Sequence, residues 1–291
     1  MTSLAFNDNQ LSQVKVTFDR TLLQRSDNDN GRFTFNLPKR VLFRKIFVEN
    51  VVLPSRLTVH SKNNIIKFQP QGVGLGEGNA DKGTTLTATL ISGVYTIAEM
   101  LTEIQFQMNA AAVVDAISSG VPNAGRTYTV IEATTNSVKN GLINIEQNTG
   151  NFIIDIRNST FKHILGLKET ILPPVGSATS FDRTTAANDF TTDFKNKFEG
   201  TSIGHILSPT IGIPDSYAGI RQGCLCSIPL PKPKDEGNYH PSTLRYLDLG
   251  GPRFLNHCEF QFINEFGTPM NFQGQVPIIT AHFIQDDRIR N

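Results

Sequence analysis

The three cysteines, one of which follows a histidine, could supply metal ligands. Cys224 and Cys226 would point to the same side of a strand, and His257 and Cys258 lie further along the chain. Structural zinc sites place at least two residues between paired cysteines and use a second pair of ligands, which this sequence lacks. Zinc binding would also need two strands to bring these positions together. We therefore expect Cys224, Cys226 and Cys258 to pack as small hydrophobic side chains.

Glycine-rich segments at residues 72–78 and 78–85 could wrap around a phosphate. The first lacks the G-x-G-x-x-G spacing of a dinucleotide-binding loop. The second has Thr84 where a phosphate-binding loop has its lysine, and residues 85–91 read as a strand where such a loop needs a helix. Both segments therefore predict a surface loop.

Carboxylates and histidines give no pattern for catalysis or for calcium. Asp27 and Asp29 precede Gly31, but aligning that glycine with an EF-hand loop leaves Ser26 and Leu37 where acidic ligands belong. The histidines occur one at a time: His60, His163, His205, His240, His257 and His282. No hydrolase or metalloprotease motif accompanies them. We expect no catalytic residue, no cofactor, no metal and no enzymatic activity.

Lys39, Arg40, Arg44 and Lys45 form the one local basic cluster. A solvated strand face is the simplest interpretation, and a surface for a polyanion or an acidic neighbour is the alternative. The whole chain has 27 basic and 26 acidic residues, a formal charge of +1. No overall field therefore attracts nucleic acid or an anionic membrane, which disfavours a DNA-binding protein.

Strands must position most of these residues. The chain has 291 residues, of which 18% are charged, and it is rich in Asn, Thr, Gly and Phe. Alternation of apolar and polar residues predicts strands at 14–18 and 33–37, joined through Asn30-Gly31 as a hairpin. The same alternation predicts the last two strands at 254–263 and 276–284, with Cys258, Phe260 and Phe262 facing inward.

One helix interrupts the strands. Thr96 and Glu99 have the spacing of a capping box, and apolar residues at helical spacing follow, which predicts a short helix near 96–110. Residues 176–199 are polar and read as a linker or long loop. Many short strands with one helix indicate an all-β sandwich or barrel. No run of about 20 apolar residues and no signal peptide are apparent, so we expect a soluble intracellular product with reduced thiols.

Two stretches of the chain resemble the penton proteins of virophages and polinton-like double-stranded DNA viruses. The first has a strand ending in proline, an Asn-Asn turn, a G-x-Y-T lead into a helix, a hairpin and a Leu-Gly corner, at residues 52–55, 61–68, 91–101, 149–154 and 164–167. The second, residues 258–272 and 278–283, is similar to the last hairpin of a viral jelly roll.

This resemblance implies a single jelly-roll β-sandwich with an inserted subdomain or long loops. Residues 1–68 and 201–291 would form the jelly roll, and 69–200 the insertion with the helix. It also implies a structural capsid protein of the virion, assembled inside the host cell. Its copies would form homopentamers at the five-fold vertices of an icosahedral capsid, among double-jelly-roll major capsid proteins.

By the same resemblance both chain ends would face the particle interior, against minor capsid proteins or packaged DNA. Arg288 and Arg290, in the tail 286–291, could then meet that DNA. Fraying of both ends in solvent is the simpler interpretation.

Two other functions suit a jelly roll. A receptor- or carbohydrate-binding module of the fibre or adhesin type would show aromatic residues on loops, but the chain has no Trp and most of its 20 Phe fall in strand patterns. A cupin-type enzyme needs clustered histidines, which the scattered single histidines oppose.

Overall fold

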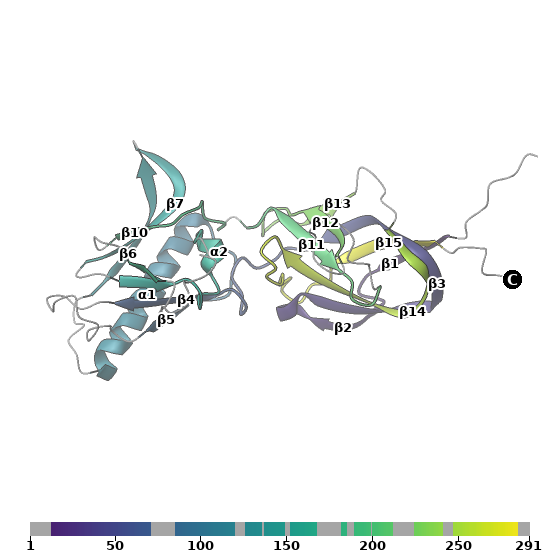
Figure 1. The fold of residues 1–291 in the computed structure, drawn as a ribbon, viewed down its shortest axis with the longest axis horizontal. Helices are drawn as coiled ribbons and strands as arrows, with labels where there is room; N and C mark the ends of the chain where they lie inside the picture. The colour runs from purple at the N-terminus through teal and green to yellow at the C-terminus, as the bar shows by residue number, and fades with distance from the viewer. Residues whose placement is uncertain are drawn as a thin grey trace, which may run out of the picture. The chain divides into compact units, whose positions relative to one another are not determined.

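The computed structural model shows a chain that divides into two compact units (Figure 1). The first unit contains residues 1–56 and 202–291, and the second contains residues 57–201. Within them the structure describes residues 13–70, 85–119, 126–135, 137–148, 152–167, 182–184, 189–198, 200–211, 224–240 and 247–284. The glycine-rich residues 72–84 and the tail 286–291 lie outside the described residues.

Eight strands build the sheet of the first unit, with a short 3-10 helix (η1, Asn28–Asn30) after the second. They are β1 (Gln13–Phe18), β2 (Leu23–Asp27), β3 (Arg32–Leu53), β11 (Ile203–Leu207), β12 (Cys224–Pro229), β13 (Gly237–Tyr239), β14 (Leu247–Asn264) and β15 (Ile278–Ile284). Their order is β1-β15-β3-β14-β11-β12, and β2 and β13 also pair with β3.

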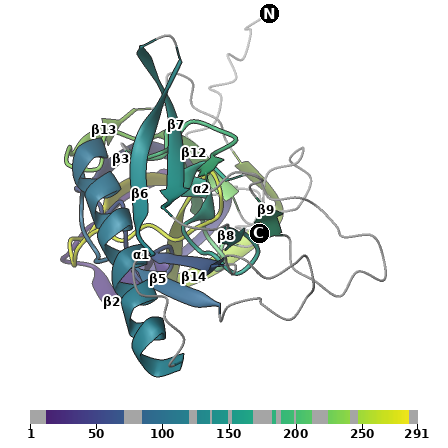
Figure 2. The same cartoon turned by 90° about the vertical axis from the view of Figure 1, so that its left-hand side faces the viewer.

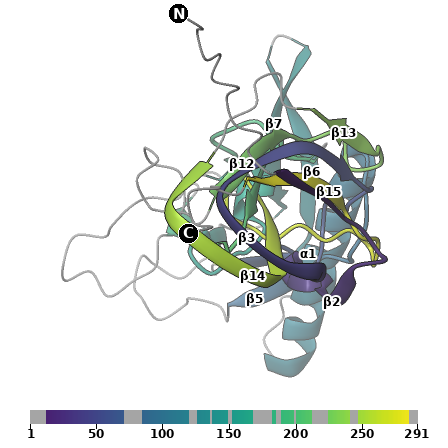
Figure 3. The ribbon, with the colours of Figure 1, turned by 90° about the vertical axis from the view of Figure 1, so that its right-hand side faces the viewer.

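Two long strands, β3 and β14, join two layers of this sheet, and Figure 3 shows both as arcs. In one layer, residues 32–36 of β3 lie between β2 and the 257–261 part of β14, which continues to β11 and β12. In the other, residues 45–52 of β3 pair with β15, which pairs with β1. This jelly-roll-like sandwich confirms the expected all-β fold.

Aromatic rings fill the space between the two layers. Phe18 of β1 makes edge-to-face contacts with Phe35, Phe260 and Phe283, at centroid distances of 5.6, 5.0 and 6.1 Å. Cys258, Phe260 and Phe262 are fully buried, as their alternation predicts. Edge-to-face pairs add to the free energy of burial, so this cluster is the main tie between the layers.

Strand pairing corrects two sequence predictions. The segments at 258–263 and 278–283 do not form a hairpin, because β3 lies between β14 and β15. The hairpin through Asn30-Gly31 joins β2 to β3, whereas β1 pairs with β15. The strand β2 was not predicted, since its residues are mostly exposed and do not alternate.

Gly31 closes the hairpin between β2 and β3. Its φ of +60° is left-handed, and a Cβ there would lie 2.5 Å from the Phe262 carbonyl oxygen. Only glycine allows this close approach of two backbones.

The second unit contains two small sheets, with strand orders β5-β4-β8-β9 and β10-β7-β6. The strands are β4 (Ile65–Pro70), β5 (Leu86–Thr89), β6 (Tyr128–Thr135), β7 (Val138–Gln147), β8 (Phe152–Asp155), β9 (Asp182–Thr184) and β10 (Asp189–Thr191). Helix α1 (Ile97–Ser119) packs against β5 and β6 (Figure 2), and α2 (Lys162–Leu165) is one turn long. Phe68, Tyr128 and Phe152 lie in their shared core.

The boundaries of the units and of the helix differ from those we expected. Residues 57–68 belong to the second unit and not to the jelly roll, because β4 pairs with β5 and β8. The segment predicted as a linker, 176–199, contains β9 and β10. Helix α1 continues past residue 110 to Ser119, since alanines follow and no glycine occurs before Gly120.

Candidate functional site

The cysteines lie on separate strands of the first unit. Cys224 and Cys226 are on β12, and Cys258 is on β14, with β11 between these two strands. Register places Cys226 opposite Ile206 of β11, and Ile206 opposite Phe262, four residues from Cys258. Cys226 and Cys258 are therefore about 16 Å apart by strand geometry, too far to share a metal ion.

Cys258 is buried and Cys224 and Cys226 are half-buried, which favours the protonated thiol at each position. Burial raises the pKa of Cys258 to about 12 and raises the pKa of Cys224 and, further, of Cys226. Thiolates bind metals and attack electrophiles, whereas buried thiols are inert. Among the described residues, no group of three His, Cys, Asp or Glu side chains is placed to hold a metal ion.

Asp27 and Asp29 serve the turn between β2 and β3. The Asp27 carboxylate accepts hydrogen bonds from the backbone N–H and side-chain amide of Asn30, at 3.2 and 2.7 Å. Asp29 accepts one from the Asn271 amide at 3.1 Å. The side-chain bond from Asn30 lowers the pKa of Asp27. Both carboxylates thus have protein partners.

The histidines stay apart from one another. His60 is buried and accepts a bond from the Lys62 backbone N–H at 3.4 Å, and His205 pairs with Ser227 across β11 and β12 at 2.9 Å. His240 and His257 are exposed, and His163 is half-buried on α2.

His282 belongs to a polar cluster that the sequence did not suggest. Its Nε2 is 2.8 Å from Glu49 Oε2, its Nδ1 contacts the Gln13 amide, and its ring stacks on Phe47 at 4.4 Å. Lys15 reaches the same Glu49 oxygen at 2.6 Å. The hydrogen bonds from Lys15 and His282 lower the pKa of Glu49. The cluster ties β1, β3 and β15 together on the side away from the core.

Two bulges distort the pairing of β3 with β14. Between the Asn36–His257 pair and the Val41–Leu255 pair, β3 spans five residues and β14 spans only two. Between the Phe43–Arg253 pair and the Lys45–Asp248 pair, the extra residues lie on β14, which spans five residues while β3 spans two. Bulges bend strands and redirect their side chains, so both strands turn here from one layer to the other.

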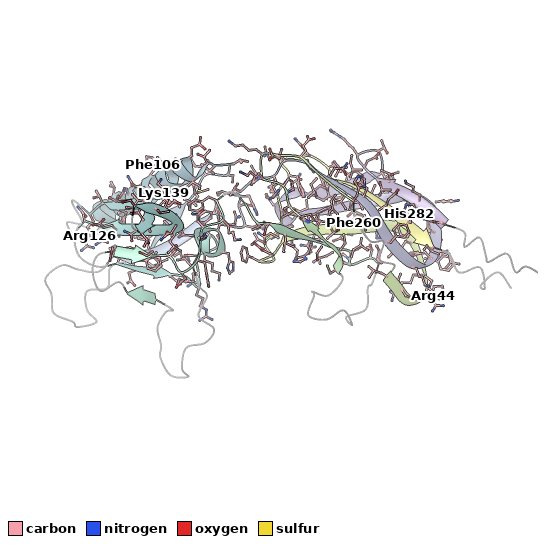
Figure 4. All side chains as sticks on the ribbon, turned by 90° about the horizontal axis from the view of Figure 1, so that it is seen from above. Arg44, Phe106, Arg126, Lys139, Phe260 and His282 are labelled. Carbon is pink, nitrogen blue, oxygen red and sulfur yellow. The ribbon has the colours of Figure 1, made fainter. Side chains whose placement is uncertain are left out.

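Five cations surround this bend, and we call them the basic corner: Lys39, Arg40, Arg44, Lys45 and Arg253. Lys39, Arg40 and Arg253 are exposed. The Arg44 Nε is 3.3 Å from Asp248 Oδ1, and Figure 4 shows Arg44 at the margin of its unit, away from the interior Phe260. The Arg40 guanidinium lies over the Phe254 ring, 4.1 Å from its centroid.

Sequence reasoning identified four of these cations and missed Arg253. It comes from a strand more than 200 residues away, and only the register of β14 brings it opposite Phe43. The exposed Phe254 was also not singled out, because it falls within the strand predicted at 254–263.

Comparisons with known proteins leave the family open. No protein-family model matches the sequence, and no curated protein matches it. Among solved structures, the crystal structure of the selenomethionine-labelled mavirus penton protein aligns with a TM-score of 0.43 and 7% sequence identity. The alignment covers 94% of this chain and 98% of that one. At these values the likeness is distant and carries no argument about function.

Proposed function

We propose that the protein is a structural, non-enzymatic capsid protein. It would be a penton whose pentamers occupy the five-fold vertices of an icosahedral double-stranded DNA virus or virophage. The observation that supports this most is the jelly-roll-like first unit, in which the penton-like ending of the sequence forms the strands β14 and β15, on either side of β3. No helix among the described residues is long and apolar enough to span a membrane.

Elements of the other penton-like stretch also support the proposal. Thr96 and Glu99 form the capping box that opens α1. The Leu-Gly corner ends α2, where Gly166 has a φ of +91° and a Cβ would lie 2.2 Å from the Phe194 carbonyl oxygen. The backbone at this corner therefore requires glycine at position 166.

Ring formation requires two different flanks on each subunit that fit one another. Head-to-tail contacts of this kind close into a ring at a definite number of copies. A low density of charge favours such flanks, because uncharged polar groups pair across an interface without the desolvation penalty of ions. Large apolar side chains exposed on the single chain, apart from Phe254 under Arg40, are candidates for burial in the ring: Ile91, Phe106, Val113, Ile131, Val138, Phe194 and Ile203.

The mass of the purified protein in solution tests the proposal. Light scattering coupled to size exclusion should give a species of five times 32.1 kDa. A protein that stays monomeric at high concentration and binds glycans would contradict the penton and indicate a carbohydrate-binding module. Co-expression with a double-jelly-roll major capsid protein should then yield shells only when this chain is present.

A further inference from the structure

The basic corner concentrates positive charge that the chain's net charge of +1 conceals. Within the described part of the chain, Lys39, Arg40, Lys45 and Arg253 form no ion pair. Asp248 stands opposite Lys45 in the strand register and is bound by Arg44. Four cations that make no ion pair with a described residue lie around one bend and attract an anion locally, whatever the total charge.

The bulges decide which way these cations point. Lys39 and Arg40 lie in the extra residues of β3, between Leu37 and Val41, which are both buried. Arg253 follows the extra residues of β14 and is exposed. A regular ladder would place alternate residues of each strand in the core, so the two bulges are what leave the neighbours Lys39 and Arg40, and likewise Arg253 and Phe254, exposed together.

Phe254 holds one of the cations in place. Its ring is 55% exposed, and the Arg40 guanidinium rests on it at 4.1 Å. A cation–π contact of this kind leaves the in-plane N–H groups of arginine available for two bonds to one phosphate. Phe254 is thus a positioning residue for Arg40.

We propose that the basic corner binds the phosphate backbone of nucleic acid. Arg40 and Lys45 are five residues apart on β3, at most about 17 Å in an extended strand. That span matches roughly five nucleotides at about 3.4 Å of rise each. Backbone binding needs several exposed cations spread along a surface, as here, whereas an acidic protein partner needs apolar anchors in a desolvated centre. Among the described residues of the corner, the large exposed apolar side chain is Phe254, and its ring is covered by the Arg40 guanidinium, so it is not free to anchor a protein.

This inference goes beyond the proposed capsid role and does not require it, because the test uses the isolated full-length chain. The probe is a fluorescein-labelled 30-base-pair DNA duplex, followed by fluorescence anisotropy at 50 mM salt. The test variant carries Lys39→Glu, Arg40→Glu and Arg253→Glu. The control variant carries three reversals at exposed positions elsewhere in the first unit, Arg20→Glu, Arg25→Glu and Lys234→Glu, and so has the same net charge.

We expect the test variant to lose at least tenfold in DNA affinity and the control variant to lose less than threefold. The logarithm of the wild-type binding constant should fall with the logarithm of salt concentration with a slope of about −3 to −4, for about four phosphate contacts. Phe254→Ala, which leaves every charge in place, should weaken binding several-fold by releasing Arg40.

Three results would overturn the inference. One is the absence of wild-type binding at 50 mM salt, and another is an equal loss in the two triple variants. The third is binding of a polyglutamate peptide, but not DNA, that depends on Lys39, Arg40 and Arg253, which would assign the corner to an acidic protein. Unfolding midpoints of all variants, measured by circular dichroism, show whether a loss reflects misfolding. Each of these results leaves the solution mass of the protein, and hence the penton proposal, unaffected.

Discussion

The ring of Phe18 on β1 meets the ring of Phe260 on β14 edge-on, with 5.0 Å between centroids and 71° between the planes. Both side chains are fully buried. The two side chains belong to different layers of the sandwich, so this contact connects β1 to the far layer. The aromatic cluster around it should dominate the stability of the first unit.

Phe260→Ala should lower the free energy of unfolding of the first unit by about 3–5 kcal/mol, because it removes a buried ring and leaves a cavity. Urea denaturation followed by circular dichroism measures the change. Phe254→Ala is the matched control on the same strand, and since that ring is 55% exposed, its effect should stay within about 0.5 kcal/mol. Equal effects of the two substitutions would contradict the layer assignment.

Gly31→Ala should destabilise the first unit by at least about 2 kcal/mol, because the added Cβ meets the Phe262 backbone as well as a left-handed φ. Gly274→Ala separates the two causes. Gly274 has a φ of +80°, but no atom lies within 4 Å of where its Cβ would stand, so only the strain of about 1 kcal/mol remains. Thermal unfolding of both variants gives the comparison, and a Gly31→Ala variant as stable as Gly274→Ala would refute the close approach.

Thr96→Ala should destabilise the second unit by about 1 kcal/mol, because Thr96 Oγ1 accepts the Glu99 backbone N–H at 3.3 Å. Thr102→Ala, at an exposed position inside α1, should instead be neutral or slightly stabilising, since alanine has the higher helix propensity. Helix content and unfolding midpoint by circular dichroism distinguish the two. A stabilising Thr96→Ala would mean that the capping box does not form in solution.

The buried thiol of Cys258 should make stability depend on alkaline pH. Its pKa is about 12 in the folded chain. In the unfolded chain a cysteine has a pKa of about 8.5. The unfolded state therefore loses this proton first, and the free energy of unfolding should fall between those two pH values, by up to about 1.4 kcal/mol per pH unit. Below about pH 8 this thiol contributes no pH dependence.

Cys258→Ala provides the measurement. The free energy of unfolding of this variant should fall less steeply with pH than that of the wild type between about pH 9 and 10.5. The comparison concerns the two slopes, so a constant difference in stability between the proteins does not affect it. Parallel curves would show that the Cys258 thiol is accessible to solvent in the folded chain.

Local sequence patterns predicted much of the fold. Alternation located β14 and β15 and the inward side of Cys258, Phe260 and Phe262, and the capping box located the start of α1. These signals work because burial on one face imposes a period on the residues concerned. The same reasoning located four cations of the basic corner, which are close in sequence.

Features that depend on pairing between distant segments were not predictable in this way. β14 and β15 looked like a hairpin because the turn residues Gly267-Thr268-Pro269 follow the first strand, yet β3 separates the two. Residues 57–68 read as jelly roll, although pairing with β8 places them in the second unit. Arg253 and the cluster around His282 depend on register and bulges, for which a single sequence holds no local signal.

The place of β15 between β1 and β3 sets the order of events during synthesis on the ribosome. The second unit is one continuous stretch, residues 57–201, and can fold as soon as it has been translated. Strand β1 precedes the second unit in the sequence, whereas its partner in the sheet, β15, follows that unit. Strand β1 therefore waits unpaired until β15 has been translated, exposed to chaperones and to neighbouring nascent chains.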